Sequence, residues 1–309
     1  MPATAPAILA LGSIGPGELA ALATAVCWTT SALFFTAAAR RLGSLILNPI
    51  RLVLALGFSA VYTVVVRGLP LPTDAAAHQW FWLGLSGLVG FFLGDLCLFR
   101  ALVLLGPRLT MLVMSLWPAI AAVLSWVLLG EGMTGLGVAG MVLTLAGVAW
   151  VVAERRPAAL DGQPHRVPWT GVALALGAAA GQAGGLVLGK MGMAGYDPFA
   201  AAQIRMIAAI AAFLLLILAL GAWPRFEAAR RHPSSVGLAA AGAMVGPFLG
   251  VSLSLLAIRT APVGVAATIM SLVPVLIIPF AAVIYKDRVG WRAVLGAAVA
   301  VAGIALLFA

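Results

Sequence analysis

Charged residues are scarce in this sequence, and their scarcity excludes an ordinary soluble protein. Asp, Glu, Lys and Arg make up 9% of the 309 residues, whereas about a quarter of a soluble domain is charged. Since 63% of the residues are hydrophobic and the mean hydropathy is +1.14, we expect hydrocarbon around most of the chain. The net charge of +9 does not predict a nucleic-acid partner, because most basic residues flank apolar segments, where they anchor helices at lipid headgroups.

Cysteine and histidine are also rare, which argues against a disulfide framework, a metal centre or an enzyme. Cys27 and Cys97 lie in apolar runs without CxxC spacing. The string Gly84-Leu85-Ser86-Gly87 superficially matches an intramembrane serine protease, but that chemistry needs a histidine base within the membrane. All three histidines fall in expected loops: His78, His165 and His232. We therefore expect no catalytic residues, no metal and no cofactor.

Long apolar runs are plentiful, in contrast, and predict an all-α polytopic membrane protein with about ten transmembrane helices. A bilayer core about 30 Å thick requires roughly 20 apolar residues per helix, and lipid offers the backbone no hydrogen-bond partners, so helices are required. Turn-forming or polar residues separate the runs, as at Gly106-Pro107-Arg108. The expected spans lie near 17–39, 46–66, 80–104, 110–129, 135–153, 169–193, 199–221, 235–258, 263–284 and 291–308.

The two halves of the chain match each other in a shared register, which predicts an internal duplication. Chance similarity between apolar helices is the alternative, but it does not account for whole strings that recur at one offset. At an offset of 156 residues, Phe92-Leu93-Gly94 matches Phe248-Leu249-Gly250, and Met114-Ser115-Leu116-Trp117-Pro118 matches Met270-Ser271-Leu272-Val273-Pro274; at 154, Ile50-Arg51 matches Ile204-Arg205.

Each repeat contains five expected spans, so the two copies enter the membrane in opposite orientations. Such inverted repeats are the architecture that many secondary transporters use to form two alternative gates. The first repeat is expected over residues 17–153 and the second over 169–308. A polar connector, 154–168, lies between them.

Several of the duplicated residues resemble the EamA unit of the drug/metabolite transporter superfamily. They are Pro118 with Glu131, Gly140 and Gly147, the echo Pro274 with Asp287, Gly296 and Gly303, and also Trp28, Arg51 and the string Leu98-Phe99-Arg100-Ala101-Leu102. The resemblance implies a ten-span carrier of small metabolites, in many relatives an exporter of amino acids or related compounds. The sequence departs from the usual pattern in having Asp at 287 and in carrying Asp95 and Arg100.

Four side chains within the expected spans are predicted to bind substrate: Trp28, Arg51, Asp95 and Gln182. Ionisable groups in spans are unfavourable by roughly 2.5–3.5 kcal/mol and need an explanation. We expect Asp95 and Arg51 to face a polar cavity and to contact a charged or zwitterionic substrate, and Asp95 to be a candidate carrier of a coupling proton. Alternatively, Asp95 pairs with Arg51 or Arg100 to hold helices together.

The first span carries a polar and aromatic cluster around Trp28, and its counterpart in the second half carries Gln182. These groups would line a pocket with an aromatic face. The alternative is that Thr29, Thr30 and Ser31 bond back to their own helix.

Two prolines inside spans, Pro118 and Pro274, are predicted hinges, because each removes a helical hydrogen bond at a matching position. The alternative is that both are simply tolerated, as prolines often are in membrane helices. Glu131 and Asp287 stand at span ends, where we interpret them as helix caps.

These features together predict a secondary transporter that exports its substrate by alternating access; a channel or a non-transporting membrane protein is the alternative. The expected partners are a small-molecule substrate, membrane lipids, a coupling proton and, through glycine-rich helix faces, a second copy of the chain. A bacterial inner membrane is the expected location. Basic residues gather in the loops after odd-numbered spans, which places both termini outside by the positive-inside rule; many relatives have them inside.

Overall fold

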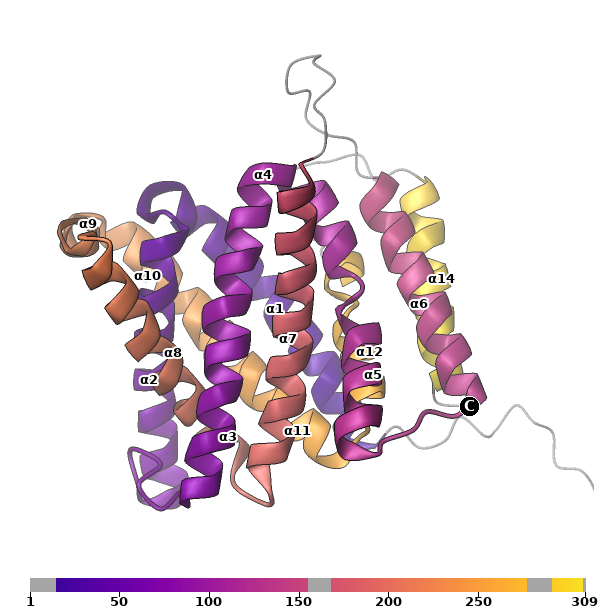
Figure 1. Ribbon diagram of the computed structural model, residues 1–309, viewed down its shortest axis with the longest axis horizontal. Coiled ribbons are helices and arrows are strands. Elements are labelled where there is room, and N and C mark those ends of the chain that lie inside the picture. Colours follow the sequence, from indigo (N-terminus) through magenta and orange to yellow (C-terminus); the bar gives the residue numbers. More distant parts are fainter. Residues whose placement is uncertain (1–14, 155–167, 277–290, 308–309) are drawn as a thin grey trace, which may run out of the picture.

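The computed structural model describes residues 15–154, 168–276 and 291–307, and all regular structure within them is helical (Figure 1). The first repeat comprises α1 (Pro16–Leu42), α2 (Ser44–Arg67), α3 (Ala77–Gly87), η1 (Leu88–Gly94), α4 (Asp95–Met114), α5 (Trp117–Leu129) and α6 (Gly135–Glu154). The second comprises α7 (Trp169–Met193), α8 (Pro198–Ala219), α9 (Trp223–Ala228), η2 (Ala229–Arg231), α10 (Pro233–Ala243), η3 (Met244–Gly250), α11 (Val251–Thr260), α12 (Val263–Met270) and α14 (Trp291–Leu307).

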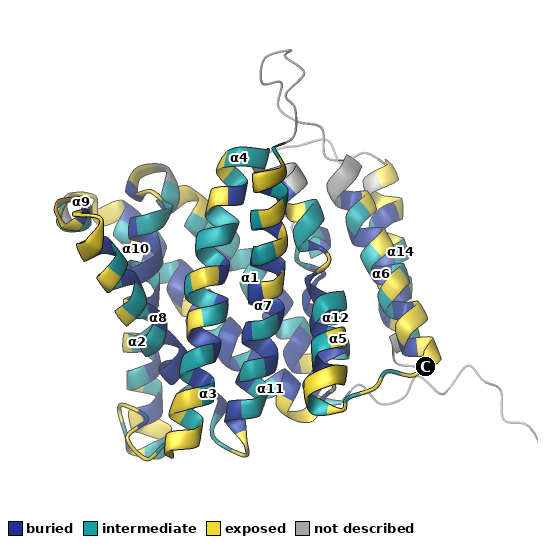
Figure 2. Cartoon of the chain, in the orientation of Figure 1, coloured by how far each residue is buried: buried dark blue, intermediate teal, exposed yellow. Residues whose placement is uncertain are grey.

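The described helices confirm a polytopic all-α membrane protein. Seven are long and apolar enough to cross a membrane, and three shorter apolar helices cover Gly135–Val151, Val263–Leu276 and Val294–Leu306. Together they coincide with the ten predicted spans. The boundary predicted at Gly106-Pro107-Arg108 does separate two spans, although the backbone between them stays helical, as lipid favours. Large apolar side chains on the outer surface, such as Val65 and Phe81, are exposed where lipid would cover them (Figure 2).

The two repeats are inverted and interlocked. A Cβ built on Gly17 of α1 would lie 2.7 Å from the Thr260 hydroxyl, and one built on Gly250 would lie 2.9 Å from the Trp28 ring, so α1 runs antiparallel to the third span of the second repeat. In the same way, a Cβ built on Gly171 of α7 would contact Leu105 and one built on Gly181 would contact Gly94, so α7 runs antiparallel to the third span of the first repeat. Because the first and third spans of one repeat run parallel, the two repeats must cross the membrane in opposite directions.

These contacts also assign the glycine-rich faces that the sequence left open between internal packing and a dimer. Gly181 and Gly185 of α7 lie backbone to backbone against Gly94 and Gly90 of η1. Both α7 glycines are buried within one chain. They therefore serve the packing of one repeat against the other, and the predicted homodimer draws no support from them.

The third span of each repeat contains a π-helical turn at the same repeat position. The first turn, η1, covers Leu88–Gly94, and the second, η3, covers Met244–Gly250, a shift of the same 156 residues found in the sequence. Such turns carry one extra residue within the helix and are frequent at functional sites. The sequence analysis did not predict them, because apolar periodicity does not report on a single inserted residue.

The fifth spans of the two repeats, α6 and α14, pack closely on each other at one end of the bundle (Figure 1). A Cβ on Gly147 would lie 2.6 Å from the Gly296 carbonyl oxygen, and one on Gly303 would lie 2.7 Å from the Gly140 carbonyl oxygen. The Thr144 hydroxyl lies 3.3 Å from the Ala300 carbonyl across the same contact. Three of the four glycines that resemble the EamA motif, Gly147, Gly296 and Gly303, therefore permit close backbone approach, and Gly140 supplies a carbonyl to the same contact.

We expect Gly147→Leu to destabilise the protein by about 1–3 kcal/mol, because the new side chain would force α6 and α14 apart. The measurement is the melting temperature of the purified protein in detergent. Gly57→Leu is the matched control, since Gly57 is exposed on α2 with no atom within 4 Å of a built Cβ. Equal melting temperatures for the two variants would contradict the close contact.

Candidate functional site

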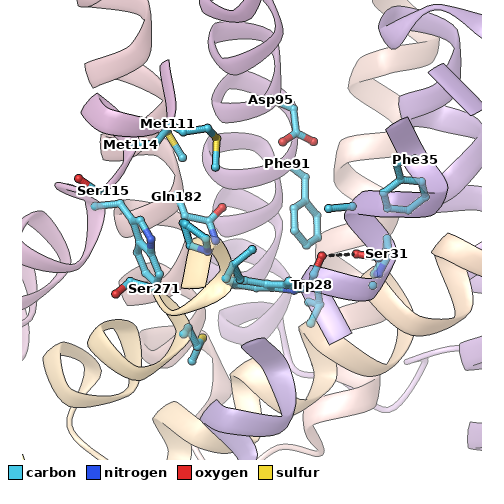
Figure 3. Close-up of a pocket in the computed structure, with 18 of the residues that line it drawn as sticks. Trp28, Ser31, Phe35, Phe91, Asp95, Met111, Met114, Ser115, Gln182 and Ser271 are labelled. Atoms are coloured by element: carbon cyan, nitrogen blue, oxygen red, sulfur yellow. Dashed lines mark hydrogen bonds between the residues drawn. The ribbon is translucent and has the colours of Figure 1, made fainter. Parts of the chain in front are cut away.

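A cavity of about 280 Å³ lies between the two repeats and is partly open (Figure 3). All four residues predicted to bind substrate line it: Trp28, Arg51, Asp95 and Gln182. Of the two predicted hinges, Pro274 lines the cavity, whereas Pro118 is buried beside the lining residue Trp117. The fold thus brings together side chains from the first three spans and from the opposing α7.

The charged residues of the cavity form a salt bridge. The Arg51 guanidinium binds the Asp95 carboxylate, and both side chains are less than one-fifth exposed. Arg51 also lies over the Phe35 ring, 5.3 Å from its centroid. The pairing that the sequence offered as an alternative to substrate contact therefore exists, with Arg51 and not with Arg100. Because the pair also lines the cavity, pairing does not remove it from the substrate's reach.

Asp95 owes its position to the π-helical turn that precedes it. It is the first residue of α4 and follows η1 directly. Phe91, within η1, points into the same cavity (Figure 3). The irregular turn therefore delivers an aromatic ring and a carboxylate to one cavity wall.

The remaining walls are mainly aromatic and aliphatic. The rings of Trp28 and Trp117 lie 6.4 Å apart at 57°, and Met111, Met114 and Met270 add flexible apolar surface. The hydroxyls of Thr29 and Thr30 donate to Ala25 and Val26 of their own helix, at 2.7 and 2.9 Å. Ser31 likewise donates to the Trp28 carbonyl of its own helix, at 3.1 Å, so the back-bonding alternative is correct for all three hydroxyls, and Ser31 also lines the cavity.

A family model decides what kind of protein this bundle is. The model of the EamA-like transporter family matches residues 15–153 and again 169–309. The chain belongs to this family. EamA-like proteins are membrane transporters, as the resemblance implied. One solved structure, titled only "Crystal structure of protein", shares the fold with a TM-score of 0.73 at 20% identity, over 94% of this chain and 95% of that one. No functionally curated protein matches the sequence.

The duplicated string Met-Ser-Leu-x-Pro coincides with an interruption of the helix in each repeat. The α-helical hydrogen-bond pattern is interrupted at Ser115–Leu116 between α4 and α5, and at the matching Ser271–Leu272 after α12, although Ser115, Leu116 and Ser271 keep right-handed helical backbone angles. Pro118 occupies the first turn of α5, where the missing N–H has no helical partner to lose. Both serines line the cavity. The breaks precede the prolines, and a hinge at either one remains a prediction.

On the side of this EamA transporter where α1 begins and α14 ends (the terminal side), an ion pair joins the two repeats. Glu131, after α5, binds Lys190 of α7. The Glu131 carboxylate also accepts from the Val263 amide at the start of α12 (2.9 Å), and Lys190 donates to the Ala261 carbonyl (3.1 Å). Glu131 therefore caps α12 of the other repeat and not the next helix in the chain, which the sequence had suggested; its counterpart Asp287 lies outside the described residues.

A second link between the repeats lies at the water boundary of the same side. The Asp74 carboxylate accepts from Arg67 (2.5 Å) and from the Tyr196 hydroxyl (2.8 Å). Burial and the bond to Asp74 raise the pKa of Tyr196 to about 12. Although burial acts in the other direction, the bond from Tyr196 and the charge of Arg67 hold the pKa of Asp74 below its usual value. The link therefore persists across the ordinary pH range.

Sequence reasoning missed several lining residues that share a helix face with the predicted ones. Phe35 lies seven residues beyond Trp28, and Phe91 four before Asp95, both spacings that place side chains on one face of a helix. Ser115 and Ser271 were quoted as part of a repeat motif without a site role. Helical spacing from Trp28 and Asp95 would have found the phenylalanines.

Proposed function

We propose that the protein is a secondary transporter that exports a small metabolite by alternating access. The observation that carries the proposal is the placement of the cavity. It lies between two inverted repeats and reaches Met111, near the start of the fourth span, and Arg51, two turns into α2. On the terminal side, Glu131 and Lys190 join the repeats. A route closed on one side by contacts between inverted repeats supports a carrier.

Under this proposal the substrate contacts Trp28, Arg51, Asp95 and Gln182. The resemblance to amino-acid exporters points to small organic solutes, and the cavity volume suits one. Asp95 is the candidate carrier of a coupling proton, since it is the one acidic side chain among the lining residues described. The breaks before Pro118 and Pro274 are the candidate points at which the halves of each span tilt.

The membrane proposed is the inner membrane of a bacterium. The last turn of α1, which carries Arg41, and α9, which carries Arg225, lie on the side opposite to the start of α1 and the end of α14 (Figure 1), so the positive-inside rule places that side in the cytoplasm. A reporter enzyme fused to the C-terminus, active in only one compartment, tests this orientation.

Counterflow tests transport itself. Proteoliposomes preloaded with single unlabelled amino acids or organic acids should accumulate the matching labelled solute transiently and with saturation. Unitary currents in a planar bilayer, with flux that does not saturate, would instead identify a channel.

A further inference from the structure

A buried arginine within the spans has no counter-charge among the described residues. Arg205 lies in α8 and its side chain is almost completely buried, with 4% of the residue exposed. The described residues supply it with neither an ion pair nor a hydrogen bond, and its Nε is an unpartnered buried donor. The Phe91 ring lies under it, with the ring centroid 4.6 Å from the guanidinium carbon. A buried cation in this state is unfavourable and needs an explanation.

The repeat relationship shows what is absent around Arg205. Arg205 occupies the position of Arg51 in the second repeat. Asp95, the first residue after η1, has Val251, the first residue after η3, as its counterpart. The second repeat therefore retains the cation but has an aliphatic side chain where the first repeat has the carboxylate.

Arg205 lies directly behind a wall of the cavity. Phe91 lines the cavity and also contacts the guanidinium, and Figure 3 shows its ring beside Asp95 and above Trp28. Glycines flank the guanidinium: a Cβ on Gly90 would lie 3.5 Å from Nη2, and one on Gly189 would lie 3.9 Å from Nη1. A turn of the Phe91 ring would open Arg205 to the cavity, and Val251 also lines it.

The charge balance then defines the substrate. Arg51 and Asp95 neutralise each other, so Arg205 leaves one positive charge at the cavity. A zwitterion or a cation would leave that charge uncompensated, whereas a monoanion would balance it. The tryptophan, phenylalanine and methionine side chains of the walls suit an apolar body.

We propose that the transported substrate is a small organic monocarboxylate with an apolar body, and that Arg205 binds its carboxylate once Phe91 turns aside. This inference rests on the proposed transport function and narrows its substrate class. It departs from the amino acids implied by the family resemblance, because an amino acid brings no net charge.

A stability cycle tests the uncompensated charge without any ligand. Val251→Asp restores the carboxylate at the position of Asp95, so it should raise the melting temperature of the purified protein, and lower it when Arg205→Gln is also present. Val251→Asn has the same shape without the charge and should lower the melting temperature in both backgrounds. Equal effects of Val251→Asp with and without Arg205 would overturn the proposal.

Binding of phenylacetate tests the substrate class. Phenylacetate at saturating concentration should raise the melting temperature by about 2 °C or more, while neutral phenylacetamide and zwitterionic phenylalanine should not. The shift should vanish in Arg205→Gln and in Val251→Asp, where an internal carboxylate occupies the cation. No shift with phenylacetate, an equal shift with phenylacetamide, or a shift that survives Val251→Asp would each overturn the assignment.

Failure of this inference can be told apart from failure of the transport proposal. Saturable counterflow of phenylalanine that Val251→Asp leaves unchanged would overturn the anion assignment and leave transport standing. Phenylacetate binding that depends on Arg205, without flux of any solute in proteoliposomes, would leave the anion site standing and overturn transport.

Discussion

Asp95→Asn should reduce transport by about 100-fold or more while the protein still reaches the membrane. The substitution keeps the shape of the side chain but leaves the Arg51 charge unpaired in the cavity, and removing one partner of a buried pair is unfavourable by about 3–5 kcal/mol. Counterflow in proteoliposomes measures the loss. Glu227→Gln, on the exposed α9, is the matched control and should transport as the wild type does.

The double variant Arg51→Gln/Asp95→Asn separates a transport role from a structural one. It restores neutrality and should restore the melting temperature, but not transport. Recovery of transport in the double variant would mean that the pair only holds the helices together. A single Asp95→Asn protein that keeps counterflow yet loses uptake driven by a pH gradient would identify Asp95 as the proton carrier.

Glu131→Gln should increase access to the cavity from the terminal side by about tenfold. The change removes the ion pair with Lys190 and weakens the bond to the Val263 amide. Hydrogen bonds to charged groups contribute about 1.5–3 kcal/mol. We use the lower end of this range because both side chains are 22% exposed. A loss of roughly 1.4 kcal/mol would raise the population of the state that is open on the terminal side about tenfold.

Cysteine labelling measures this opening. Leu186 lies on α7 four residues from Gln182 at the cavity and four from Lys190, and is 2% exposed. In a chain with Cys27→Ala and Cys97→Ala, Leu186→Cys should react slowly with an impermeant thiol reagent added on the terminal side, and faster when Glu131→Gln is present. Glu18→Gln, on the same side in α1 and in no described ion pair, should not change the rate. An unchanged rate with Glu131→Gln would show that this pair does not close the route.

The fold was largely predictable because the bilayer leaves few alternatives. Lipid demands long apolar helices, so each predicted span, such as 46–66 or 169–193, overlaps an observed apolar helix. The shared register of Phe92-Leu93-Gly94 and Phe248-Leu249-Gly250 predicted the duplication, and an odd number of spans predicted the inversion. Pro118 and Pro274 predicted a disturbed turn in each span, because proline removes the bond to the carbonyl four residues earlier, and the interruptions at Ser115 and Ser271 lie within that turn.

The site was predictable only in part, for a physical reason. Arg51, Asp95, Trp28 and Gln182 stand out as polar or aromatic groups in apolar spans, and the structure places all four at one cavity. Which of them face one another depends on how each helix is rotated about its axis. The one extra residue of a π-helical turn such as η1 rotates the helix that follows it by about 100°. Periodicity in the sequence is too coarse to register that change.

The sequence alone determined that lipid surrounds the chain, where its helices lie, and that it contains two inverted repeats. Apolar side chains favour lipid whatever the packing, and an odd number of spans per repeat inverts the second copy, so neither conclusion needs tertiary information. The tertiary structure decided which charged side chains pair with one another. It paired Asp95 with Arg51, joined Glu131 to Lys190, and left Arg205 behind Phe91 without a carboxylate. Pairing of charges is a matter of a few ångströms between helices far apart in the chain, and only the packed bundle specifies such distances.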